Sequence, residues 1–292
     1  MTPTPLLLFA PPGGDIAWAA ASIGHCAGML ALPELRLGSA ATVDEVLALH
    51  ARAEDRAGDG LLRTVAQLRF GAQQPDTIDA AAHWLQRRAE WTIVQLLDWL
   101  LSHANGRHLV FHEPHDALRI DAIEGLLRAL PDALVVQLVE AVPQFSAHVH
   151  HELQGRLFIP PEAQHHADRY PVLAPSLMWF RVHDTLLRVQ QSNPDVRWRR
   201  LRSDFLRDRP HRVLPPLLAE IAARATPGDS GVLPFAMPGP PNAPLGDDVR
   251  FLRTPGHWPE PEAVPADPGL DHPDLLALAE RLGVPLPQGA LS

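Results

Sequence analysis

Apolar and polar positions along the chain fall into blocks that predict strands and helices in alternation. A continuous apolar run predicts a buried strand over residues 6–10, and a small-residue pattern predicts a helix over 16–30. The same order of strand and helix recurs over 107–114 and 115–130, over 132–141 and 143–153, and over 195–206 and 210–224, with a long helix over 175–192. Because strands alternate with helices, we expect an α/β fold with a parallel sheet flanked by helices.

Two stretches depart from this alternation. Residues 43–104 carry several helical patterns separated by Gly and Pro, which predicts a helical insertion. From Thr226 onward the chain is rich in Pro and Gly, with little periodicity before a final helix over 272–283. We therefore expect one α/β domain over 1–225, including the insertion, and an irregular covering segment over 226–292. Disorder in that segment is the alternative.

Composition and charge limit the classes of function. The net charge is −9 and no long basic run is present, so neither a nucleic acid nor an anionic membrane is an expected partner. The apolar run near the N-terminus is too short for a signal peptide or a membrane span, and we expect a cytoplasmic protein. All 25 basic residues are Arg, which excludes a Schiff-base lysine and a P-loop lysine.

The loop between the first strand and the first helix has the shape of a phosphate loop without its usual chemistry. It reads "APPGGDIAW", and a strand that leads through a Gly-containing loop into a helix commonly presents backbone N–H groups to a phosphate. This loop contains no Lys, Arg, Ser or Thr.

Several short strings along the chain together carry a family resemblance. In chain order they are "FAPPGGDIAW", "LPEL", "FHEPHDAL", "LPDALVVQLVEAV", "RSDFL" and "GPPNAPLGDDVRFL". Their series resembles the bacterial sulfotransferases, especially those associated with polyketide and peptide assembly lines, over nearly the whole chain. The resemblance implies a P-loop-like α/β fold that, in the family, binds 3′-phosphoadenosine 5′-phosphosulfate and transfers its sulfuryl group to a hydroxyl.

The first loop departs from the family at the donor site. The family's Arg-Ser-Gly-Thr, which meets the 5′-phosphosulfate, corresponds here to Gly13, Gly14, Asp15 and Ile16. The two glycines still offer backbone N–H groups, but Asp15 brings a carboxylate to the phosphate position. As the N-cap, Asp15 is expected to satisfy the N–H donors of its own helix and to stabilise it by about 1 kcal/mol. We therefore expect the anion site to be filled by the protein itself.

The other donor contacts implied by the resemblance are altered as well. The family's Lys-Ser/Thr after the second strand corresponds to His112 and Glu113, and the Arg that holds the 3′-phosphate corresponds to Glu140. The Ser that accompanies this Arg falls near Ser146 or His148. Three anion contacts are thus lost together, and two of the positions have become acidic.

Three hypotheses remain open from the sequence. The first and favoured one is a sulfotransferase-like protein that uses no cofactor and serves as a binding or partner subunit, for a protein or a small-molecule acceptor, in natural-product biosynthesis. The second is an active, divergent sulfotransferase that uses the sulfate donor, with Arg119 or Arg202 replacing the lost contacts. The third is an enzyme of different chemistry, with His112 and Glu113 as acid and base in a cleft that Glu140 also lines.

A histidine-rich stretch raises the question of a metal. It places His148, His150, His151, His165 and His166 within a short span, and His148 and His151 share a face of the predicted helix. Neither an H-E-x-x-H motif nor a cysteine pair is present, because Cys26 is the single cysteine. The sequence therefore predicts no metal site, and metal binding by 148–166 stays open.

Overall fold

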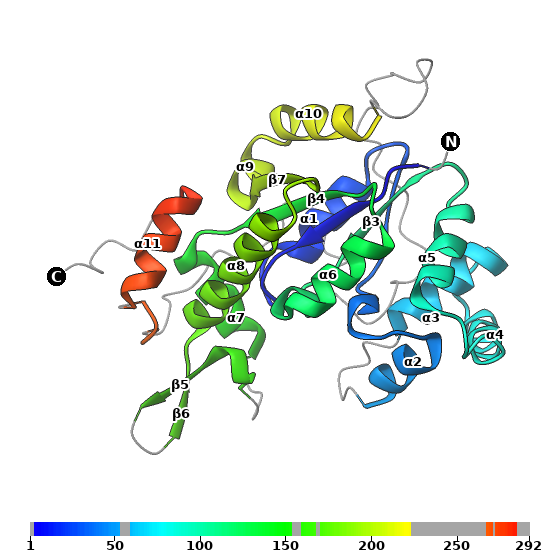
Figure 1. Cartoon of the computed structure of the whole chain (residues 1–292), viewed down its shortest axis with the longest axis horizontal. Helices are drawn as coiled ribbons and strands as arrows, with labels where there is room; N and C mark the ends of the chain where they lie inside the picture. Colours follow the sequence, from blue (N-terminus) through cyan, green and yellow to red (C-terminus); the bar gives the residue numbers. More distant parts are fainter. Residues whose placement is uncertain are drawn as a thin grey trace.

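A parallel five-stranded sheet lies at the centre of the molecule (Figure 1). The computed structural model describes residues 3–52, 59–153, 159–167, 170–222, 267–270 and 272–284. The strand order is β2-β3-β1-β4-β7, and each neighbouring pair is parallel. The strands are β1 (Leu6–Phe9), β2 (Met29–Ala31), β3 (His108–His112), β4 (Leu134–Val139) and β7 (Arg197–Arg202). The predicted fold class is confirmed.

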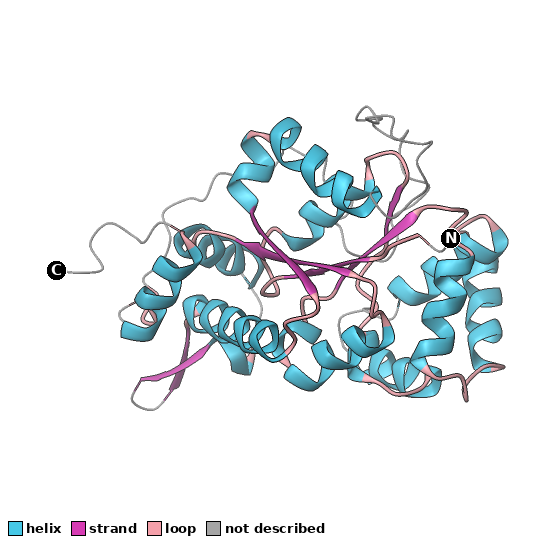
Figure 2. Cartoon of the chain, turned by 45° about the horizontal axis from the view of Figure 1, so that its top comes forward, coloured by secondary structure: helices cyan, strands magenta, loops and turns pink. Residues whose placement is uncertain are grey.

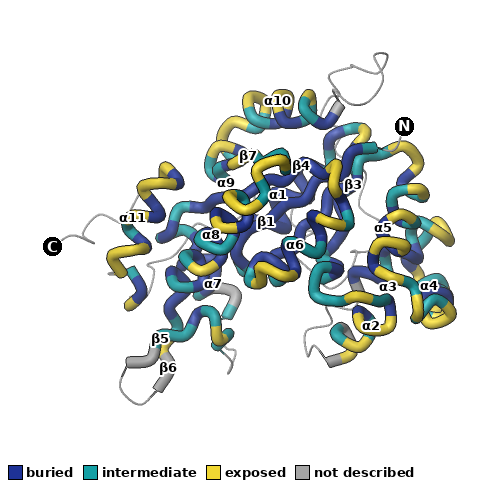
Figure 3. The backbone as a smooth tube through the Cα atoms, viewed as in Figure 1, coloured by how far each residue is buried: buried dark blue, intermediate teal, exposed yellow. Residues whose placement is uncertain are grey.

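Alternate residues of the central strand enter two different cores. Leu7 and Phe9 of β1 pack on one face of the sheet, whereas Leu6 and Leu8 pack on the other. The second face is covered by α1 (Ile16–Gly24), α9 (Ser203–Asp208) and α10 (Pro210–Ala222), and the first by α6 (Ile120–Ala129) and α8 (Pro175–Ser192). Figure 2 shows the strands between these helices, and Figure 3 shows the central strands β1 and β4 buried along their length. Burial on both faces explains the continuous apolar run of β1 and the nearly continuous one of β4, which only Gln137 interrupts.

The described residues of the stretch 43–104, for which the sequence predicts a helical insertion, are mainly helical and lie to the right in Figure 1. It comprises α2 (Val43–Arg52), α3 (Asp59–Val65), the π-helix η2 (Ala66–Phe70), α4 (Pro75–Gln86) and α5 (Ile93–Ser102). Its apolar side chains join the same core as Leu7 and Phe9. Trp84 packs against Trp91 and Trp99 inside it, at ring-centroid distances of 5.5 and 4.5 Å. The insertion therefore extends the main core.

A third core forms beyond the carboxyl end of β4. It gathers α7 (Val142–Leu153), α8 and α11 (Pro273–Leu282), with the hairpin of β5 (Gln164–Ala167) and β6 (Tyr170–Leu173) beside it. The helix predicted over 272–283 is α11, which packs against α8. The irregular part of the predicted covering segment, over 226–266, lies outside the described residues.

The predicted helix over 16–30 is too long. The helix α1 ends at Gly24, and the last residues of the predicted helix begin β2 instead. A Cβ on Gly24 would lie 2.4 Å from the Cβ of Ala31, so the close approach of α1 to β2 requires glycine. Gly28, with φ of 79°, turns the chain between them. The remaining short elements are the 3₁₀ turns η1 (Leu37–Ser39), η3 (Asp116–Leu118) and η4 (Pro161–Ala163).

No helix in the described part of the chain is both long and apolar enough to cross a membrane.

Candidate functional site

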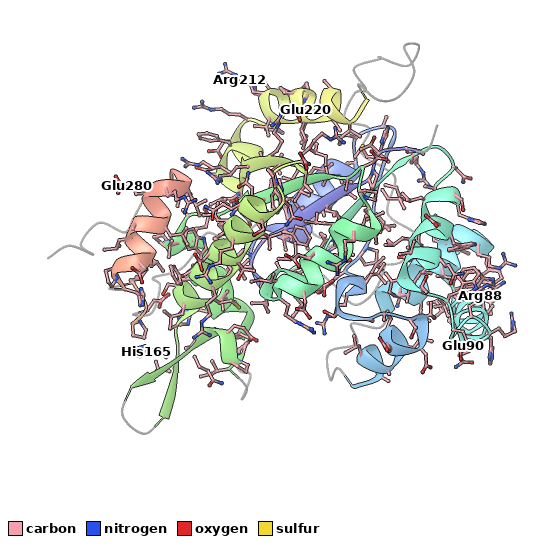
Figure 4. All side chains as sticks on the ribbon, in the orientation of Figure 1. Arg88, Glu90, His165, Arg212, Glu220 and Glu280 are labelled. Carbon is pink, nitrogen blue, oxygen red and sulfur yellow. The ribbon has the colours of Figure 1, made fainter. Side chains whose placement is uncertain are left out.

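The acidic residues identified from the sequence lie at the carboxyl ends of the central strands. Glu140 follows β4 directly, Glu113 follows β3, and the loop that contains Asp15 joins β1 to α1. The carboxyl ends of parallel strands are where open α/β sheets commonly bind ligands. Side chains fill the space between these strands and the covering helices (Figure 4).

Glu140 closes the first loop with its own carboxylate. Its Oε2 accepts a hydrogen bond from the backbone N–H of Asp15, at 3.1 Å. A Cβ on Gly14 would lie 2.6 Å from the same oxygen, so the carboxylate sits directly against the loop backbone. The indole of Trp179 donates to the Glu140 backbone carbonyl at 2.9 Å and fixes this end of β4. The Asp15 N–H in this loop is therefore bound by the Glu140 side chain.

Asp15 occupies the N-cap position of α1, but the prediction that its side chain caps the helix was wrong. The side chain makes no capping hydrogen bond, and the backbone has φ of −70° and ψ of 3°. This is outside the extended conformation that normally aims an N-cap side chain at its helix. Oδ2 of Asp15 instead pairs with Nη2 of Arg207, from α9, at 2.5 Å. A long-range charge pair has thus displaced the local cap.

His148 completes a buried cluster with these two carboxylates. It lies on α7, with Nδ1 at 2.5 Å from Oε1 of Glu140 and 3.7 Å from Oδ1 of Asp15. One potential ligand atom from each of the three residues lies within 4.8 Å of the others. All three side chains are at most 5% exposed. We refer to Asp15, Glu140 and His148 as the buried triad.

Burial dominates the electrostatics of the triad. It raises the pKa of Asp15 to about 7, an effect increased by Glu140 and opposed by His148 and Arg207. It raises the pKa of Glu140 to about 8, against the Asp15 N–H and Arg207, which favour the charged form. At neutral pH the two carboxyl groups therefore retain protons that exposed carboxyl groups would have lost.

Ser146 is bound by a carboxylate from the C-terminal part of the chain. Its hydroxyl donates to Oδ2 of Asp267 at 2.7 Å. Asp267 also accepts from the N–H and the hydroxyl of Ser176, at 3.0 and 2.7 Å, and from the N–H of Gly269 at 3.0 Å. All three residues, Ser146, Ser176 and Asp267, are buried. A second acidic side chain thus occupies a position that the sequence had matched to a donor contact.

His112 and Glu113 hold a neighbouring segment of backbone. Glu113 accepts from the N–H groups of Leu35 and Arg36, at 3.3 and 2.7 Å, and His112 Nδ1 donates to the Leu32 carbonyl at 2.8 Å. Burial raises the pKa of Glu113 well above its usual value, and the nearby Asp116 and Glu34 carboxyl groups raise it further. These hydrogen bonds give both residues a structural role, and their role as acid and base stays a prediction.

The arginines expected to replace the lost contacts pair locally instead. Arg119 forms a bidentate pair with the exposed Asp121, and Arg202 pairs with Asp204. The cation that reaches the buried triad is Arg207, which the sequence reasoning missed. Nothing in the sequence spacing connects Arg207, on α9, with the first loop.

The histidine-rich stretch separates in the structure. His148 belongs to the buried triad, whereas His165 lies on β5, opposite Val172 of β6. Figure 4 places His165 at the edge of the molecule beside the hairpin. The His150 ring is half-buried, and burial lowers its pKa. The side chains of His151 and His166 lie outside the described part of the structure.

Comparison with known proteins supports the resemblance at the level of the fold. No protein-family model matches the sequence, and no curated protein matches it. The sulfotransferase domain from the curacin biosynthetic pathway superposes with a TM-score of 0.69 and 16% identity, covering 98% of this chain and 99% of that one. The sulfotransferase domain from the Synechococcus PCC 7002 olefin synthase gives a TM-score of 0.68 and 16% identity, covering 98% and 97%. The chain therefore has the fold of these bacterial sulfotransferase domains.

Proposed function

We propose that this chain is a sulfotransferase-fold protein that does not use 3′-phosphoadenosine 5′-phosphosulfate and acts as a binding or partner subunit. One observation carries the proposal. The carboxylate of Glu140 accepts the Asp15 N–H in the loop to which the resemblance assigns the donor phosphosulfate. A donor anion placed there would need the N–H group and the space that Glu140 already uses.

The second anion position supports the same conclusion. The resemblance assigns a 3′-phosphate contact to Ser146, and the Ser146 hydroxyl donates to Asp267. A phosphate bound there would displace a buried carboxylate from four hydrogen bonds. Removing one partner from a buried network of charged groups typically lowers the free energy of unfolding by about 3–5 kcal/mol.

Electrostatic repulsion contributes less to excluding the sulfate donor than the hydrogen bonds already made at the site do. The donor carries roughly four negative charges, which need cationic groups and N–H donors around them. Because burial raises the pKa of Asp15 and Glu140, these carboxyl groups are partly neutral near pH 7, and their repulsion of an anion is smaller than that of two full charges. In this proposal the donor is excluded mainly because Glu140 already accepts the Asp15 N–H and Asp267 already accepts the Ser146 hydroxyl.

A role in natural-product biosynthesis is also part of the proposal. The two similar domains come from the curacin biosynthetic pathway and from an olefin synthase. A second sulfotransferase with an intact donor loop, encoded beside this chain, would favour the partner role. Co-expression of the two, followed by size-exclusion chromatography, is expected to give one complex.

A turnover assay tests the proposal. The purified chain is incubated with the sulfate donor and a panel of hydroxyl compounds, and release of adenosine 3′,5′-bisphosphate is measured by chromatography beside an active sulfotransferase. We expect release at the spontaneous rate only. Faster release that is abolished in Glu140→Gln would contradict the proposal and establish an active sulfotransferase.

A further inference from the structure

We propose that Asp15, Glu140 and His148 form a binding site for a divalent first-row metal ion of the zinc type. An imidazole nitrogen and two carboxylate oxygens are a donor set that suits zinc. The three residues come from separate parts of the fold: the loop before α1, the end of β4, and α7. Their side chains are at most 5% exposed, so the site is built into the interior.

Each carboxylate has one oxygen fixed by the protein and one turned toward the imidazole. Arg207 holds Oδ2 of Asp15, and Oδ1 is 3.7 Å from Nδ1 of His148. The Asp15 N–H holds Oε2 of Glu140, and Oε1 is 2.5 Å from the same Nδ1. Outer hydrogen bonds that orient ligating carboxylates in this way are a general feature of metal sites.

Oε1 of Glu140 supplies the second observation that points to a ligand. Oε1 is buried and accepts no hydrogen bond within the described structure, and its ion-pair contact is Nδ1 of His148 at 2.5 Å. A buried carboxylate oxygen without a hydrogen bond is costly, and a cation bound at Oε1 would satisfy this oxygen.

The spacing of the donor atoms suits an ion after a small adjustment. Ligand atoms at 2.0–2.2 Å from a tetrahedral zinc lie roughly 3.3 Å apart. The two carboxylate contacts to Nδ1 of His148, at 2.5 and 3.7 Å, fall on either side of that spacing, and the whole set lies within 4.8 Å. Three protein ligands would leave a fourth position for water, as in open zinc sites.

Zinc titration of the chelator-treated full chain tests this site. Isothermal titration calorimetry compares wild type with Glu140→Gln, which keeps the shape of the side chain and removes its charge, and with His148→Ala. The control is His165→Ala, because His165 lies on the hairpin outside the triad. We expect one zinc per chain in wild type and in H165A, with binding at least tenfold weaker in E140Q and H148A.

Cobalt supplies a spectroscopic readout that surface histidines would not reproduce. Wild type with Co²⁺ is expected to show visible absorption bands of a nitrogen- and oxygen-ligated ion, and these bands should be lost in E140Q. If H148A does not fold by circular dichroism, E140Q decides the outcome. Absence of tight zinc binding in wild type, or equal binding in wild type and E140Q, would overturn the proposal. Because no nucleotide is used, that failure would leave the proposed function intact.

Discussion

Replacing Gly14 by alanine tests whether the Glu140 carboxylate is seated in the first loop. Gly14 has no positive φ, unlike the neighbouring Gly13 at 86°, so backbone strain does not complicate the substitution. The new Cβ would lie 2.6 Å from Oε2 of Glu140 and 3.0 Å from Cδ2 of Phe145. The carboxylate must therefore move, and the hydrogen bond from the Asp15 N–H is lost.

The expected magnitude follows from that hydrogen bond. A bond between neutral groups contributes about 1 kcal/mol and one to a charged group about 1.5–3 kcal/mol, so Gly14→Ala, next to a partly neutral Glu140, is expected to lower the free energy of unfolding by about 1–3 kcal/mol. Urea denaturation followed by circular dichroism measures it. The matched control is Gly125→Ala, since Gly125 lies within α6 and its Cβ would meet a single carbonyl oxygen at 3.6 Å. That control is expected to be neutral or stabilising by up to about 1 kcal/mol.

A double-mutant cycle separates the carboxylate from the rest of the loop. In the Glu140→Ala background the clash with Oε2 is absent, and Gly14→Ala should cost at least about 1 kcal/mol less than in wild type. If G14A were as stable as wild type, or if its cost were the same in both backgrounds, the assignment of Glu140 to the anion position of the loop would be wrong.

Two further predictions concern buried polar groups. Asp267→Asn weakens the hydrogen bonds from Ser146 and Ser176, so it is expected to lower the free energy of unfolding by about 2–4 kcal/mol and to expose α11 to limited proteolysis. If α11 stayed as protected as in wild type, Asp267 would not hold α11 against the rest of the fold. His183 has its pKa lowered from 6.5 to about 3, first by burial and then by Arg200. As the pH falls, His183 is therefore protonated in the unfolded chain before it is protonated in the native state. The free energy of unfolding is expected to fall by up to about 5 kcal/mol between pH 6.5 and 3, relative to His183→Gln. Parallel stability curves for the two proteins across that range would refute a buried neutral imidazole.

The sequence predicted the framework of the fold because its main strands are chemically uniform. Residues 6–10 form a continuous apolar run, and 133–139 form an apolar run interrupted only by Gln137, as expected for strands covered on both faces. The short strand β2 was missed because Met29–Ala31 continue the apolar pattern of the preceding helix. Its existence depends on the close packing at Gly24, which no local pattern reveals.

The sequence suggested candidate site residues but not their contacts. The family resemblance led to Asp15, Glu140 and Ser146, and the structure gives all three buried polar partners. Whether Asp15 caps α1 or pairs with Arg207 depends on the position of α9 in space, and Arg207 lies 192 residues from Asp15 in the sequence. Asp267 pairs with Ser146 across 121 residues. Propensity and motif spacing describe neighbours in sequence, so they carry no information about such pairs.

Calorimetric titration with adenosine 3′,5′-bisphosphate tests the central claim most directly. This nucleotide carries the phosphates that the donor loop and Ser146 would hold in a functional sulfotransferase. We expect no saturable binding to the wild-type chain up to millimolar nucleotide, and no rise in the thermal midpoint, whereas a ligand at a hundredfold excess over its Kd would stabilise the fold by about 2.7 kcal/mol. Saturable binding of one nucleotide per chain, weakened by Ser146→Ala, would show that Glu140 and Asp267 yield to the donor and would contradict the account.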